Sequence, residues 1–127
     1  MARPKARELT QRELEIMQVF WADGQLTANE VRDSLADTGT DLAYTTVATL
    51  VKILVEKSFL KQVTQVRPFE FKPIRSFEDV SQNLLSDVIQ RVFGGSREQL
   101  LVQLMEQKKL TKRERQLLKD ILKEQSK

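Results

Sequence analysis

The sequence predicts a mainly α-helical protein with one small β-hairpin. Apolar residues recur at helical spacing along most of the chain, and a Ser or Thr followed three residues later by an acidic or Gln residue precedes several of these runs. One stretch, residues 59–73, alternates apolar and polar residues instead. With 127 residues and 40% apolar content, the chain can form one domain or two small ones. We expect two regions, residues 1–74 and 75–127.

Two helices are expected first, at residues 11–22 and 28–36. Each begins directly after a threonine that can form a capping box with the glutamate three residues later, namely Thr10 with Glu13 and Thr27 with Glu30. In such a pair each side chain accepts a hydrogen bond from the backbone N–H of the other residue. Gly24 follows the first apolar run, and glycine is the usual residue of a left-handed helix end.

The next helical run has two distinct faces. Its apolar stripe consists of Val47, Leu50, Val51 and Leu54, which lie at i, i+3, i+4 and i+7. The opposite face carries Thr45, Thr49, Lys52 and Glu56, flanked by Thr46 and Ile53. Because β-branched threonine is a mediocre helix former, helix stability does not explain a row of threonines.

The hairpin is expected directly after this helix. Its apolar positions are Leu60, Val63 and Val66, then Phe69 and Phe71. Pro68 and Pro73 predict edge strands, since proline cannot donate to a β-ladder. Three helices followed by a hairpin is the order of a winged helix-turn-helix.

Residues 76–127 are expected to be helical throughout, in three helices separated by Gly94-Gly95 and Lys108-Lys109. Their predicted starts are Ser76 with Asp79, Ser96 with Gln99 and Thr111 with Glu114. Such a short helical region buries little surface alone, yet the apolar stripe of its first helix is wide. We therefore expect a homodimer whose contact includes Leu84, Val88 and Val92.

Composition narrows the function classes. The chain has no cysteine and no histidine, which excludes disulfides, thiolate or imidazole metal sites, and Cys or Ser-His nucleophiles. Its four glycines form no phosphate-binding loop. We expect no catalysis and no cofactor. No apolar run has membrane-spanning length and no signal-peptide pattern opens the chain, so we expect a cytoplasmic protein without membrane contact.

The distribution of charge is more informative than the net charge of +3. Residues 42–71 are locally basic through Lys52, Lys57, Lys61 and Arg67, whereas residues 23–41 are acidic. Hydroxyls and amines on an exposed helix can bond to phosphates and base edges, and hairpin bases can hold the backbone or enter a minor groove. We expect double-stranded DNA to be bound by Thr45, Thr46, Thr49, Lys52, Ile53, Lys61 and Arg67.

Other interpretations stay open. The same helix face could dock a protein in a winged-helix adaptor, and a small-molecule sensor would need a pocket between the helical regions. Arg3, Lys5 and Arg7 could form a basic arm on phosphate, although short termini are usually disordered. We interpret a further basic cluster as solvated helix ends: Lys108, Lys109, Lys112, Arg113 and Arg115.

The chain resembles the penicillinase-repressor (BlaI/MecI) family of bacterial transcriptional repressors. The resemblance lies in LTQRELEIMQVFWADGQLTANEV, YTTVATLVKILVEKSFL, VRPFEFKP and a helical tail with an internal GG. It implies a homodimer with an N-terminal winged helix and a C-terminal dimerisation region, bound to a palindromic operator. It places Thr45, Thr46, Thr49 and Lys52 on the recognition helix and Arg67 in the wing.

This chain departs from the family pattern at several positions. Ile53 stands where the family often has Arg, Ser58 where it commonly has Gly, and Val66 where the wing usually has Gly. In β-lactam-responsive members an Asn-Phe bond is cleaved on induction, and the corresponding bond here is Gln103-Leu104. Because this pair differs from Asn-Phe, the resemblance does not imply cleavage of this chain, and a regulatory protease or sensor stays an open, unidentified partner.

Overall fold

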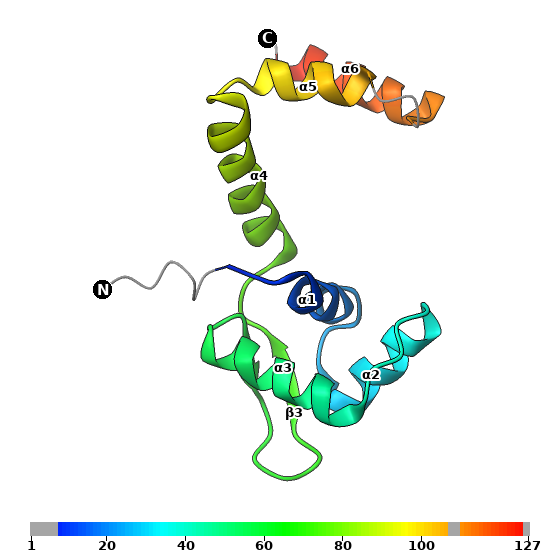
Figure 1. Ribbon diagram of the computed structural model, residues 1–127, viewed down its shortest axis with the longest axis vertical. Helices are drawn as coiled ribbons and strands as arrows, with labels where there is room; N and C mark the ends of the chain where they lie inside the picture. Colours follow the sequence, from blue (N-terminus) through cyan, green and yellow to red (C-terminus); the bar gives the residue numbers. More distant parts are fainter. Residues whose placement is uncertain (1–7, 107–109, 126–127) are drawn as a thin grey trace, which may run out of the picture. The chain divides into compact units, whose positions relative to one another are not determined.

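A computed structural model describes residues 8–106 and 110–125 (Figure 1). Within these ranges the chain forms the helices and strands α1 (Gln11–Asp23), β1 (Leu26–Thr27), α2 (Ala28–Asp37), α3 (Tyr44–Glu56), β2 (Leu60–Gln62), β3 (Glu70–Pro73), α4 (Phe77–Phe93), α5 (Arg97–Glu106) and α6 (Lys112–Gln125). The predicted winged helix-turn-helix is confirmed, and helices follow it. The predictions for Arg3, Lys5, Arg7, Lys108 and Lys109 lie outside the described residues.

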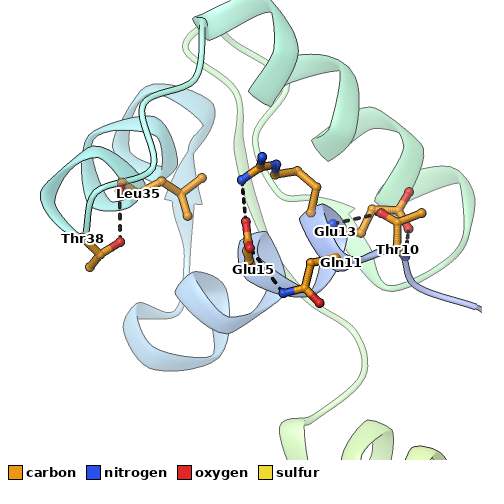
Figure 2. Close-up of polar contacts among 7 residues, drawn as sticks. Thr10, Gln11, Glu13, Glu15, Leu35 and Thr38 are labelled. Carbon is orange, nitrogen blue, oxygen red and sulfur yellow. Dashed lines mark hydrogen bonds and ion pairs between the residues drawn. The ribbon is translucent and has the colours of Figure 1, made fainter.

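The predicted helix starts are confirmed because their capping bonds are present. At α1 the Glu13 N–H donates to Thr10 Oγ1 at 3.1 Å, and the Thr10 N–H donates to Glu13 Oε1 at 2.9 Å (Figure 2). The same reciprocal pair begins α2 and α6. The serine hydroxyls that precede α4 and α5 accept one backbone N–H each.

The small sheet differs from the prediction. It has three antiparallel strands in the order β1-β3-β2, so β3 is the middle strand and not an edge. Strand β1 pairs only with Glu70 and Phe71, which leaves Pro73 with a neighbour on one side alone. Proline is tolerated there because no ladder hydrogen bond is needed on the open side. Val63 and Val66 lie outside the strands, in the turn.

The core lies between α1, α2, α3 and the sheet. Its members are Ile16, Met17, Phe20, Ala28, Val31, Leu35, Val47, Val51, Leu54, Phe59, Leu60 and Val80. Val80, from the first turn of α4, is the last of them, and the chain divides into two compact units between Val80 and Ser81. The first unit therefore includes the start of α4.

The end of α3 fixes the approach to the hairpin. The Phe59 N–H donates to the Leu54 carbonyl at 2.9 Å, and the Ser58 N–H donates to the Val55 carbonyl at 3.0 Å. These are the two bonds of a Schellman motif, with Ser58 in the left-handed position at φ 68°. Gly24 at the end of α1 has φ 91° and ψ −119°, so it too has positive φ but lies outside the left-handed helical region.

Aromatic contacts hold the segment between β3 and α4. Trp21 Nε1 donates to the Arg75 carbonyl at 2.9 Å, and the Trp21 and Phe77 rings meet edge to face at 5.5 Å. In the second unit, by contrast, no described residue from Ser81 onward is buried. None of the described helices is both long and apolar enough to cross a membrane.

Candidate nucleic-acid interface

Helix α3 is anchored on one side and presents polar side chains on the other. Val47, Val51 and Leu54 are buried in the core. The predicted contact residues Thr45, Thr46, Thr49 and Lys52 are all exposed, whereas Ile53 is half-buried. The core therefore holds α3 so that its hydroxyls and one amine face outward together.

The turn of the hairpin is held by hydrogen bonds of its own residues. The Val63 N–H donates to the Glu70 carbonyl at 2.7 Å, and the Glu70 N–H donates to Thr64 Oγ1 at 3.0 Å. The exposed Arg67 places its guanidinium over the Phe69 ring, 5.0 Å from the ring centre. Stacking of this kind restricts the arginine while leaving its in-plane N–H groups free to donate.

Lys52 and Arg67 line the same groove. It has a volume of about 680 Å³ and lies between α3, the start of α2 and the hairpin. Both bases line it, so a cation from the helix and one from the hairpin share one concave surface. Lys61 is exposed on β2 but is not among the residues that line this groove.

Lys57 is not an available base, although it contributes to the basic character of residues 42–71. Its Nζ lies 2.9 Å from Glu13 Oε1 and donates to the Glu8 carbonyl at 2.8 Å. The side chains of Lys57 and Glu13 are only 18% and 4% exposed. The bases of residues 42–71 that face solvent are therefore Lys52, Lys61 and Arg67.

The ion pair also sets the state of Glu13. Burial raises the pKa of this carboxyl, but hydrogen bonds from Lys57 and the Thr10 backbone, with the charge of Lys57, outweigh it. The net result is a pKa below the ordinary value of 4.5. Glu13 therefore stays ionised at neutral pH and holds the end of α3 against α1.

Sequence analysis missed several residues of the groove. Tyr44, Ala48 and Val55 line it, and they lie on the side of α3 between its buried stripe and its threonines. Because these residues are spaced i, i+4 and i+11, a helix places them on one side, and this spacing could have revealed a third face of α3. Asn29, at the start of α2, could not have been found from the local sequence pattern, because it lines the groove only once the chain has folded and α2, α3 and the hairpin lie together.

Within residues 8–106 and 110–125, no group of three or more metal-binding side chains is present.

These features define a winged helix-turn-helix protein with a polar helix face and two bases beside an open groove. Residues 9–124 match the penicillinase repressor family, and the chain belongs to that family. The predicted resemblance is confirmed.

The chain is similar to named members of the family. It is 29% identical over 104 residues to the transcriptional regulator BlaI of Mycobacterium tuberculosis, covering 80% of this chain and 75% of that protein. It is 26% identical over 120 residues to the penicillinase repressor of Bacillus licheniformis, covering 94% and 93%. Among solved structures, the DNA-binding domain of the repressor BlaI aligns with a TM-score of 0.51 and 28% identity, covering 62% of this chain and 93% of that chain.

Proposed function

We propose that this protein is a cytoplasmic transcriptional repressor that binds a palindromic operator as a homodimer and occludes a promoter. The observation that carries the proposal is the exposed row of Thr45, Thr46 and Thr49 on α3, next to a groove lined by Lys52 and Arg67. Membership of a repressor family supports it.

Helix α3 is the proposed recognition helix, which contacts the bases of the DNA. Its threonine hydroxyls can donate to or accept from base edges, and their methyl groups can pack on thymine methyls in the major groove. Lys52 and the exposed edge of Ile53 continue this surface toward the end of the helix. Because Val47, Val51 and Leu54 fix the helix to the core, the contacting side chains are presented by a rigid element.

The proposed role of the hairpin is to hold the DNA at its backbone or minor groove. Arg67 stacks on Phe69 and can turn its N–H groups to a phosphate or a narrow minor groove, where the potential is most negative. Lys61 adds a second exposed base on β2. These contacts supply affinity, whereas the α3 contacts supply sequence preference.

Helix α4 is the proposed dimer contact. Leu84, Val88 and Val92 are exposed and lie at i, i+4 and i+8, which places them on one stripe. A second copy can cover this stripe through the same surface, as in a two-fold interface. Two-fold symmetry then requires two half-sites about 10 bp apart, or a multiple of that spacing.

A regulatory protease or sensor is a further proposed partner. The bond that corresponds to the family cleavage site, Gln103-Leu104, lies inside α5. A protease needs an extended substrate, so cleavage there requires local unfolding of the helix.

The test is selection of bound duplexes from a random DNA library. We expect the protein to enrich a palindrome, and we expect the Lys52→Ala, Arg67→Ala double variant to lose it. The matched control is Lys112→Ala, Lys119→Ala, which removes the same charge from exposed positions of α6. If the wild-type protein enriches no sequence, the adaptor reading, in which the Thr45 and Thr49 face docks a protein, takes its place.

Salt dependence gives a second measure of the same contacts. If Lys52 and Arg67 each neutralise one phosphate, a dimer neutralises about four, and the binding constant falls about 100-fold between 50 and 200 mM salt. A constant that hardly changes over this range contradicts the proposal.

A further inference from the structure

The groove between α3 and the hairpin has the dimensions of a small-molecule site. Its volume of about 680 Å³ lies within the range of about 300–1,000 Å³ usual for pockets that bind organic ligands. It is formed within the first compact unit by α2, α3 and the hairpin.

The walls of the groove suit an aromatic body. Tyr44, Ala48 and Val55 line it from α3, and Phe69 and Phe71 line it from the hairpin and β3. Aromatic walls favour planar ligands, since rings gain from edge-to-face and offset stacking as well as from burial. The neighbouring Pro68 extends the apolar surface.

The charge of the groove has one sign. Lys52 and Arg67 line it, and no acidic residue does. Neither base forms an ion pair with a described residue; Arg67 stacks on Phe69 instead. Two cations beside an apolar hollow are the complement of a ligand with one anionic group and an apolar ring system.

We propose that this groove binds an aromatic organic monoanion, with the anion held by Lys52 and Arg67 and the rings placed between Tyr44, Phe69 and Phe71. This ligand site is different from the proposed dimer contact and from the proposed cleavage bond. One consequence rests on the proposed function: because Lys52 and Arg67 are also proposed DNA contacts, the anion and DNA exclude one another, and such a compound acts as an inducer.

The test uses two probes that differ by a single sulfonate group. One is 1-anilinonaphthalene-8-sulfonate, and the other is N-phenyl-1-naphthylamine, which has the same ring system without the sulfonate. Binding to the full chain is followed by NMR of labelled alanine and valine methyl groups. Ala48 and Val55 report on the groove, whereas Val88 and Val92 report on the exposed stripe of α4.

We expect the sulfonate to shift the Ala48 and Val55 signals saturably, and the neutral probe to bind there at least about tenfold more weakly, because it lacks the charge-assisted contacts. Replacing both bases in Lys52→Gln, Arg67→Gln should weaken the sulfonate by a similar factor and leave the neutral probe unchanged. Shifts confined to Val88 and Val92, or equal affinities of the two probes in the groove, overturn the proposal.

Competition is measured last. Adding a duplex enriched by selection should displace the sulfonate from Ala48 and Val55. If the shifts persist in saturating duplex, the inducer mechanism is wrong. The probe titrations contain no DNA, so a failure of the repressor proposal leaves their result intact and the two failures are distinguishable.

Discussion

The two compact units differ in how far they bury their apolar side chains. Every buried hydrophobic residue of the described chain lies at or before Val80, whereas the second unit exposes Leu84, Leu85, Val88, Val92, Val102, Leu117 and Ile121. Both contain well-capped helices, so the difference is not one of helix formation. The first unit buries a hydrophobic core within one chain, although Val66, Ile74 and Phe77 stay exposed on it, whereas the described part of the second unit buries none of its apolar side chains and leaves a surface that another molecule can cover.

This contrast separates two kinds of binding. A unit with a complete core can present polar side chains from fixed positions, as α3 does with its threonines. A unit with an uncovered apolar stripe can gain stability from association, since apolar burial is the main favourable term in protein association. The following predictions test this division, in order of expected effect.

The largest effect is expected from Val88→Asp in α4. If this stripe forms the two-fold contact, the change buries two unpaired carboxylates and weakens the dimer at least about 100-fold. Sedimentation equilibrium measures the dissociation constant. Ser86→Asp, at an exposed position on the other side of the helix, is the control and should leave it unchanged. A wild-type chain that is monomeric at micromolar concentration removes the dimer proposal.

Within the first unit, Glu13→Ala is expected to cost the most. It leaves Lys57 largely buried with only the Glu8 carbonyl as partner, and breaking such a pair lowers the free energy of unfolding by about 3 kcal/mol. Urea unfolding measures the loss, which should not vary with protein concentration. The control is Glu15→Ala, whose more exposed pair with Arg12 is worth about 0.5 kcal/mol. Equal losses in the two variants contradict this ranking.

The same carboxyl predicts a dependence on pH. Because the pKa of Glu13 lies below 4.5 in the folded protein, the unfolded state binds more protons in acid. Its contribution is therefore present above pH 4.5 and is lost as the pH falls through the lowered pKa. In Glu13→Gln this part of the acid destabilisation should be missing. Urea unfolding of both proteins between roughly pH 6 and 3 tests it: their difference should shrink in acid, and a constant difference contradicts it.

The smallest effect is expected from Ser58→Gly. The left-handed conformation at φ 68° is strained for serine because of its Cβ atom. Glycine lacks this atom, so the free energy of unfolding should rise by about 0.5–1 kcal/mol. Thermal unfolding measures the gain. Ser34→Gly inside α2 is the control and should lose about 0.5 kcal/mol, because glycine is the poorer helix former and no such strain is relieved there. A loss at both positions contradicts the explanation.

The sequence predicted features that depend on a few neighbouring residues. Helix starts were read correctly because a capping pair such as Thr10 and Glu13 spans only four positions. The orientation of α3 was read correctly because its apolar stripe repeats at helical spacing. Strand β1 was missed because two residues show no alternation, and its pairing with Glu70 and Phe71 is not local.

The candidate site was predicted only in part, for the same physical reason. The exposure of the threonines and Lys52 follows from one helix, but the groove needs α2, α3 and the hairpin together. Lys57 was counted toward the basic character of residues 42–71 because its partner, Glu13, lies 44 positions away and could not be seen from local sequence. Ion pairs between distant segments leave no periodic trace, so a basic stretch overstates the charge that a surface offers.

Trp21 has a practical consequence. It is the single tryptophan of the chain, and its indole is fixed by the Arg75 carbonyl and the Phe77 ring where the first unit passes into α4. Indole emission depends on the polarity and hydrogen bonding around the ring. The protein thus carries one native fluorophore at this joint, and its unlabelled emission can follow, in real time, any event that loosens residues 75–77 from α1.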